Sequence, residues 1–143
     1  TLTIEDAAGN SSSCVAVVTV TDVTPPTALC QDTTIYLDNA GTVTIDETFV
    51  DDGSFDNGTI VLYDVSPNTF DCSTTGPNTV TLTLTDDGGL TNSCPSIVTV
   101  LDTITPTIAC MDTTVYLDIN GLVSIDSSFV DAGSFDNCAD LTL

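Results

Sequence analysis

The side chains of this chain that could do chemistry are mostly carboxylates. Its 143 residues contain 21 Asp and Glu but no Lys, Arg or His, which gives a formal net charge of −21 at pH 7. No ion pair can form between side chains, so each carboxylate must be solvated, hydrogen-bonded, or neutralised by a bound cation. The densest group lies in residues 46–57, which hold five acids and Asn57. Acids that converge from such loops could bind a hard cation.

The same composition argues against several function classes. Nucleic acid binding requires cationic side chains to contact phosphate, and the chain has none. Insertion into a membrane is not expected, because no stretch resembles a membrane span. A glycosidase-like pair of carboxylates is the enzymatic alternative, but it needs a lined pocket, and the chain has no Trp and few aromatic residues to build one. A catalytic thiol would lack a His to activate it. We therefore expect a protein that is not an enzyme.

The elements that would position these acids are repeated. Cys30 recurs as Cys110 (110 − 30 = 80), residues 33–38 (TTIYLD) recur as 113–118 (TTVYLD), and residues 53–57 (GSFDN) recur unchanged as 133–137. Self-similarity at a fixed long period is typical of a modular array. We expect residues 1–23 to be the C-terminal part of one repeat, 24–103 a complete repeat, and 104–143 the N-terminal part of the next. The chain then reads as an excerpt from a longer tandem protein.

Within the complete repeat, the pattern predicts short strands. Residues 79–85 alternate between apolar residues and Thr, which is typical of a half-buried strand. Residues 97–101 follow the turn at 86–89 and are expected to pair with that strand as a hairpin. Residues 34–37 and 42–45 are expected to form a second hairpin, and 60–65 a further strand. The fold class that follows is all-β, with tandem immunoglobulin-like β-sandwich repeats of 80 residues.

In such a sandwich, the acidic loop, the turn at 86–87 and the incoming linker would share one pole of the module. Calcium takes six to eight oxygen ligands and suits acids that converge from several loops. A calcium ion there would also fix the angle between repeats. The alternative is that the acids are solvated turn residues, since Asp and Asn are favoured in turns. The candidate metal ligands are Asp22, Asp51, Asp52, Asp56, Asn57, Asp86, Asp87, Asp131 and Asp136.

Several segments together resemble a known family. The run from Asp6 to Val20, the Pro25-Pro26-Thr27 linker and the segments around Cys30 and Cys72 resemble the hyalin-repeat (HYR-like) immunoglobulin-fold modules. The variant is similar to tandem copies in very large secreted surface proteins of Bacteroidota. The resemblance implies an extracellular, non-enzymatic repeat used in adhesion or as a stalk, and it identifies no ligand.

The six cysteines suit small modules that fold in an oxidising compartment. Cys30 starts the first strand of the complete repeat and Cys94 the last, at the same pole of an immunoglobulin-like sandwich, so we favour a Cys30–Cys94 disulfide. The competing Cys94–Cys110 pair would have to span an extended strand and a linker.

The second pair of cysteines is incomplete in this copy. The family pattern has cysteine at both places, but Gly58 stands where the next repeat has Cys138. Cys72 is therefore expected to be a buried free thiol or a cross-link to another chain or unit. Cys138 is expected to pair with a residue beyond the end of the excerpt.

Short acceptor patterns for glycans also occur, although such patterns are common by chance. Two have the N-linked form, and three resemble the Asp-Thr form used for O-glycans in Bacteroidota. The candidate residues are Asn10, Asn57, Thr33, Thr113 and Thr103.

These observations favour a structural module of a cell-surface adhesin or extracellular fibre, secreted and stiffened by disulfides and calcium. Its partners would be neighbouring repeats of the same protein. Two alternatives are a glycan- or protein-binding adhesive module and a self-assembling filament in which copies exchange strands.

Overall fold

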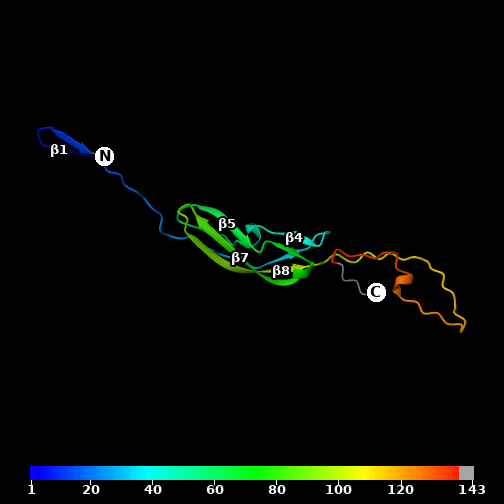
Figure 1. Cartoon of the computed structure of the whole chain (residues 1–143). Helices are drawn as coiled ribbons and strands as arrows, with labels where there is room; N and C mark the ends of the chain where they lie inside the picture. Colours follow the sequence, from blue (N-terminus) through cyan, green and yellow to red (C-terminus); the bar gives the residue numbers. More distant parts are fainter. Residues whose placement is uncertain (139–143) are drawn as a thin grey trace.

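A computed structural model describes residues 1–138 of the chain. Figure 1 shows an elongated molecule with a folded middle part, which we call the body (residues 33–101), a small hairpin at the N-terminal end and the residues after 101 at the other end. The strands are β1 (Leu2–Glu5), β2 (Ser11–Cys14), β3 (Thr33–Tyr36), β4 (Thr42–Thr44), β5 (Ile60–Ser66), β6 (Thr69–Asp71), β7 (Gly76–Asp86) and β8 (Thr91–Leu101). Single-turn 3-10 helices are η1 (Glu47–Phe49), η2 (Cys72–Thr74) and η3 (Ser127–Phe129).

The predicted all-β class is confirmed, since residues 1–138 contain strands and short 3-10 turns but no α-helix. One sheet has the strand order β3-β8-β7-β5, in which β3 is parallel to β8 and the other neighbours are antiparallel. β4 and β6 form a second sheet, and β1 and β2 form a third. Across the described residues, none of the helices has the length and apolar character needed to cross a bilayer.

The long hairpin of β7 and β8 follows the predicted alternation. Val80, Leu82 and Leu84 on β7 are completely buried, while the threonines between them are more exposed. Asp86 closes the turn, because its backbone carbonyl accepts from the N–H of Gly89 at 3.1 Å and its Oδ1 accepts from the N–H of Leu90 at 2.7 Å. Gly89 has a φ of 84°, which a residue with a Cβ rarely adopts. The turn residues therefore set the register of the hairpin.

The second predicted hairpin, 34–37 with 42–45, is wrong. The turn itself forms, with the N–H of Gly41 donating to the carbonyl of Asp38 at 2.9 Å. Beyond the turn the strands separate, because β3 pairs with β8 and β4 pairs with β6. This separation sends Ile35, on β3, and Ile45, directly after β4, into the core from different places; both are 3% exposed.

The hydrophobic core lies entirely in the middle of the chain. A disulfide between Cys30 and Cys94, the favoured pair, lies beside it with a Cα–Cα distance of 5.9 Å. Residues at the core positions of the two ends of the chain are exposed instead. The buried apolar residues are Ile35, Leu37, Ile45, Val50, Val65, Phe70, Val80, Leu82, Leu84, Val98 and Val100.

Candidate metal centre between linker and body

Three acids from separate parts of the chain meet where the linker enters the body. Asp22 lies in the linker, Asp56 in the loop before β5, and Asp86 at the end of β7. One carboxylate oxygen from each lies within 4.8 Å of the others. We call these three acids, together with Asn57, the first junction.

Asp86 is the buried member of this group, with 1% of its surface exposed. Its Oδ1 accepts from the N–H of Leu90, but its Oδ2 is buried and has no hydrogen-bond partner. Asp56 shows the same division, since its Oδ2 accepts from the N–H of Gly58 at 2.8 Å and its buried Oδ1 has no partner. A buried carboxylate oxygen without a partner is costly, by several kcal/mol for an ionised group. Both oxygens therefore need a hydrogen-bond donor or a bound cation, and the chain contains no cationic side chain to serve as either.

Asp22 is held in position by two donors. Its Oδ1 accepts from the N–H of Thr24 at 2.9 Å, and the side-chain amide of Asn57 donates to its two oxygens at 3.3 and 3.2 Å. First the Thr24 N–H and then the Asn57 amide lower the pKa of Asp22 below its ordinary value. The linker carboxylate is thus ionised at neutral pH.

A fourth acid borders the group. A Cβ built on Gly58 would lie 3.1 Å from an oxygen of Asp22, 3.1 Å from one of Asp87 and 3.2 Å from one of Asp56. Carboxylates from two loops and the linker therefore surround Gly58, and only a residue without a side chain leaves the space between them open. Asp87 itself is exposed and can turn towards the group or towards solvent.

The arrangement fits a calcium ion. Two oxygens bound to one calcium at about 2.3–2.6 Å are at most about 5 Å apart, so three oxygens within 4.8 Å can share one ion. Asp22, Asp56 and Asp86 would hold the ion, with Asp87 and water completing its coordination. The ion would supply charge neutralisation and a fixed link between linker and body.

The other candidate ligands named from the sequence lie elsewhere. Asp51 accepts from the N–H of Ser54 at 3.1 Å, and Asp131 accepts from the N–H and hydroxyl of Ser134 at 2.9 and 2.6 Å. Both are turn residues, as in the alternative interpretation, although each is half-buried. Asp52 is exposed and lies outside the group of three acids. Of the nine sequence candidates, the structure therefore brings together Asp22, Asp56, Asn57 and Asp86, with Asp87 beside them.

Part of this geometry recurs one period later. Asp102 Oδ1 accepts from the N–H of Ile104 at 3.0 Å and from the side-chain amide of Asn137 at 3.2 Å. Asp136 Oδ2 accepts from the N–H of Cys138 at 3.1 Å, while Asp136 Oδ1 and Asn137 Oδ1 are buried without partners. We call Asp102, Asp136 and Asn137 the second junction. Asp102 was missed from the sequence, although the period of 80 residues relates it to Asp22 (22 + 80 = 102).

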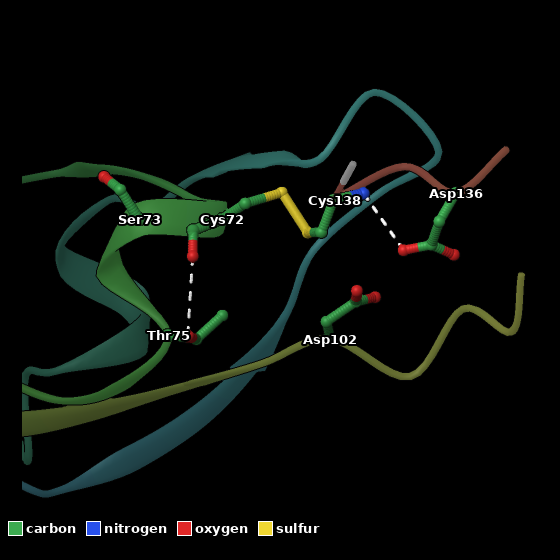
Figure 2. A pocket seen from close by; sticks show the side chains of 6 residues that line it. All are labelled: Cys72, Ser73, Thr75, Asp102, Asp136 and Cys138. Atoms are coloured by element: carbon green, nitrogen blue, oxygen red, sulfur yellow. Dashed lines mark hydrogen bonds between the residues drawn. A yellow bond between two sulfur atoms is a disulfide. The ribbon is translucent and has the colours of Figure 1, made fainter. Parts of the chain in front are cut away.

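A disulfide crosses the second junction. Cys72, in η2, is bonded to Cys138 with a Cα–Cα distance of 5.4 Å. Figure 2 shows the carboxylates of Asp102 and Asp136 beside this disulfide, at an open pocket that Ser73 and Thr75 also line.

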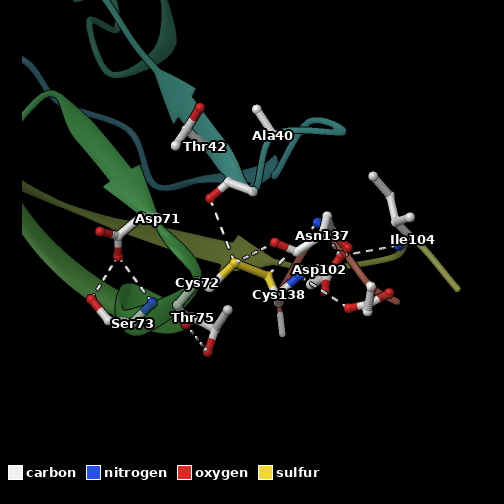
Figure 3. Close-up of a disulfide and its surroundings, with 12 residues drawn as sticks. Ala40, Thr42, Asp71, Cys72, Ser73, Thr75, Asp102, Ile104, Asn137 and Cys138 are labelled. Carbon is white, nitrogen blue, oxygen red and sulfur yellow. Dashed lines mark hydrogen bonds between the residues drawn. A yellow bond between two sulfur atoms is a disulfide. The ribbon is translucent and has the colours of Figure 1, made fainter. Parts of the chain in front are cut away.

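The disulfide decides between the alternatives for Cys72 and corrects the expectation for Cys138. Cys72 is neither free nor joined to another chain but is cross-linked to the segment expected to be the next unit, and the partner of Cys138 lies within this chain. The reason is that the loop carrying Cys138 returns to the body. There the carbonyl oxygens of Gly41 and Asn137 both lie 3.6 Å from Cys72 Sγ (Figure 3). The alignment of Cys138 with Gly58 could not reveal this return.

The glycan candidates are spread over the surface. Asn10, Thr103 and Thr113 are exposed, and Thr33 is half-buried at the start of β3. Asn57 is exposed, but its amide nitrogen donates to Asp22, so a glycan on that nitrogen would disturb the first junction.

Comparisons of the chain with family models, with curated proteins and with solved structures found no match. The resemblance to hyalin-repeat modules therefore stays a prediction. The assignment of the junctions depends on their geometry alone.

Proposed function

We propose that this chain is part of an extracellular structural array, in which immunoglobulin-like sandwich modules form a rod and calcium fixes each joint. The observation that carries this proposal is the buried Asp86 carboxylate, whose Oδ2 has no partner beside two further acids. A structural joint explains why one of those acids, Asp22, comes from the linker. An ion that binds linker and body together would restrict bending between modules.

The disulfides support the extracytoplasmic part of the proposal. Cys30–Cys94 lies within the complete repeat and Cys72–Cys138 joins it to the next segment. Disulfides form and persist in oxidising compartments, and small modules use them to supplement a limited core. We infer that the chain works outside the cell, as a secreted or surface-attached protein.

The sandwich architecture is supported by how the core is built. Ile35, Val80 and Val98 enter it from the four-stranded sheet, and Phe70 enters it from β6 of the smaller sheet. Side chains from two sheets that meet in one core are typical of β-sandwiches.

The test is thermal unfolding in calcium and in excess chelator, with both disulfides intact. A ligand that binds only the folded state stabilises it by about 3 kcal/mol at about 100 times its Kd. For a body of this size we expect a rise in Tm of about 10–25 °C. Asp86→Asn should abolish the rise, whereas Asp52→Asn, which removes the same charge outside the group, should keep it. An identical Tm with and without calcium in the wild-type chain would refute the metal centre.

A further inference from the structure

One residue of the first junction has a chemical reactivity of its own. Asn57 is followed by Gly58, and the same dipeptide occurs once more in the chain, at Asn120–Gly121. The side-chain amide of an Asn is open to attack by the backbone nitrogen of the next residue. Glycine hinders this attack least, because it has no side chain and its backbone is the most free to rotate. Asn57 and Gly58 are both exposed and lie outside the strands, so water also reaches them.

The nitrogen that would attack is already hydrogen-bonded to a base. The N–H of Gly58 donates to Asp56 Oδ2 at 2.8 Å. A carboxylate at this distance can take the proton as the nitrogen attacks, since general bases act within about 2.6–3.2 Å. At the second dipeptide the N–H of Gly121 donates to the backbone carbonyl of Asp118 at 2.9 Å, and a carbonyl is no base. The two dipeptides therefore differ in the group that faces the nucleophile.

The carboxylates of the first junction also require the glycine. A Cβ on Gly58 would lie 3.1–3.2 Å from oxygens of Asp22, Asp56 and Asp87, so a larger residue would crowd all three. At the second junction the corresponding residue after Asn is Cys138, whose side chain shields its backbone nitrogen. The reactive dipeptide thus belongs to the open junction and not to the one with a disulfide.

We propose that Asn57–Gly58 is a site of spontaneous deamidation, and that a cation bound at the first junction suppresses the reaction. The suppression rests on the proposed function, because it needs the calcium ion. The reactivity of the dipeptide does not, because it depends only on the nucleophile, the base and water.

The reaction consumes one water and releases one ammonia. The Gly58 nitrogen forms a bond to Asn57 Cγ, and its proton passes through Asp56 Oδ2 to the leaving nitrogen as the Cγ–Nδ2 bond breaks. Ammonia departs and leaves a five-membered cyclic imide. Water then opens the imide at one of its two carbonyls. One opening leaves an aspartate in place of Asn57, and the other leaves an isoaspartate, in which the chain runs through the former side chain.

Calcium would slow the ring closure in two ways. An ion that shares the Asp56 carboxylate draws charge from it and makes it a weaker base. The ion also ties Asp56 to Asp22 and so restricts the backbone rotation that brings Gly58 to the side chain of Asn57. If only the ion-free loop reacts, the rate falls by the factor 1 + [Ca²⁺]/Kd, which is about tenfold at about ten times the Kd.

The product would change how the linker is held. The Asn57 amide donates to both oxygens of Asp22, at 3.3 and 3.2 Å. A carboxylate in its place cannot donate at neutral pH, and it adds a negative charge beside Asp22, Asp56 and Asp86. Without a cation these charges repel and release the linker, whereas with a cation the new carboxylate is a further oxygen ligand. Deamidation would therefore convert a joint held partly by a hydrogen bond into one that depends on calcium.

The test follows deamidation in the whole chain at mildly alkaline pH, with both disulfides intact. Samples are kept in chelator and in calcium at about ten times the Kd from a Tm titration, and peptide mass spectrometry measures conversion at Asn57 and Asn120. We expect Asn57 to convert in chelator and about tenfold more slowly in calcium. Asn120, which lies outside the first junction, should convert at one rate in both. An Asn57 that stays intact in chelator while Asn120 converts would overturn the proposed reactivity.

The Tm of the same samples separates the two proposals. A Tm that rises in calcium while Asn57 converts equally fast in both samples would leave the metal centre standing and overturn the suppression. A Tm that does not change would overturn the metal centre, and the conversion of Asn57 in chelator would still decide the reactivity.

Two pairs of variants test the base and the product. Asp56→Asn should slow conversion of Asn57 in chelator by about tenfold or more, whereas Asp52→Asn should not; an unchanged rate in a folded Asp56→Asn chain would overturn the role of the base. Asn57→Asp should lower the Tm in chelator by about 5 °C and enlarge its rise in calcium. Asn39→Asp, which adds the same charge at an exposed turn residue, should leave that rise unchanged. Equal rises in these two variants would overturn the proposed change in the joint.

Discussion

Asp22 and Asp102 accept the same pair of hydrogen bonds. Each accepts from the backbone N–H two residues later and from the side-chain amide of the Asn 35 residues later. The two linkers are therefore held in the same way, and the junctions differ at the next residue, where Gly58 in one is Cys138 in the other. One junction leaves space among its carboxylates, and the other gains a covalent link.

The covalent link depends on a glycine across the junction. Gly41 has a φ of 71°, and a Cβ there would lie 2.7 Å from the Asn137 carbonyl oxygen and 2.8 Å from Cys72 Sγ. Gly41→Ala should cost about 1–2 kcal/mol of backbone strain and also displace Cys138 from Cys72. The readout is the fraction of Cys72–Cys138 disulfide formed in a glutathione redox buffer, which should fall.

A matched control separates the two effects. Gly121 is the counterpart of Gly41, with a φ of 76° and nothing within 4 Å of the added Cβ. Gly121→Ala should bring the backbone strain alone and leave the disulfide fraction unchanged. Equal disulfide loss in both variants would show that the close approach to Cys72 is unimportant.

The disulfide of the body should carry much of its stability. Replacing Cys30 and Cys94 together by Ser opens a loop with a separation of 64 residues, which the chain-entropy relation values at about 4 kcal/mol. Urea unfolding followed by far-UV circular dichroism would measure the loss. Cys14→Ser, at an exposed free cysteine, should leave the free energy of unfolding of the body unchanged.

The same residue type should behave differently in the body and in the N-terminal hairpin. Leu82 is completely buried, whereas its counterpart Leu2 is 64% exposed. Leu82→Ala should lower the free energy of unfolding by about 2–5 kcal/mol, because it leaves a cavity in the core. Leu2→Ala should change it by less than about 0.5 kcal/mol in urea titrations at low protein concentration. A similar loss in both variants would mean that Leu2 is buried in solution.

Acid should remove the contribution of Asp71 to the free energy of unfolding in a defined pH range. The hydroxyl of Ser73, and then its backbone N–H, lower the pKa of Asp71 below its ordinary value. A group with a lowered folded-state pKa stabilises the fold above its unfolded pKa of about 4 and loses this contribution as pH falls through the folded value. The stability advantage of the wild type over Asp71→Asn should therefore be constant near neutrality and vanish below about pH 4. Urea titrations at a series of pH values would measure it, and an advantage that grows in acid would contradict the assignment.

Local patterns in the sequence were enough to predict β3, β4, β5, β7 and β8, but not β1, β2 or β6 and not all of the strand partners. The alternation at Val80, Leu82 and Leu84 identified β7, because burial on one face of a strand leaves a period of two. The turn at Asp38 suggested a hairpin, yet β3 and β4 joined different sheets, since partner choice depends on the packing of residues distant in sequence.

The candidate site was likewise only partly predictable from the sequence. Its three acids, Asp22, Asp56 and Asp86, were among the sequence candidates, because acids at the pole of a module are visible as loop residues. The sequence did not reveal which of the nine candidates would converge. Asp51 and Asp131, for example, accept hydrogen bonds within their own turns instead. A cross-link from Cys72 to another unit was among the alternatives, but its partner Cys138 was not identified, because the pairing depends on the path of a loop in the next segment.

The Cys30–Cys94 disulfide has a mechanical consequence for a chain under tension. Without it, unfolding the body would release the whole span from Cys30 to Cys110, 80 residues, or about 270 Å at 3.3–3.6 Å per residue. With it, the covalent path runs through the sulfur bridge and then along only 16 residues (110 − 94 = 16), or about 55 Å. A pulled chain would therefore behave as a tether that lengthens little even after the body has lost its folded structure.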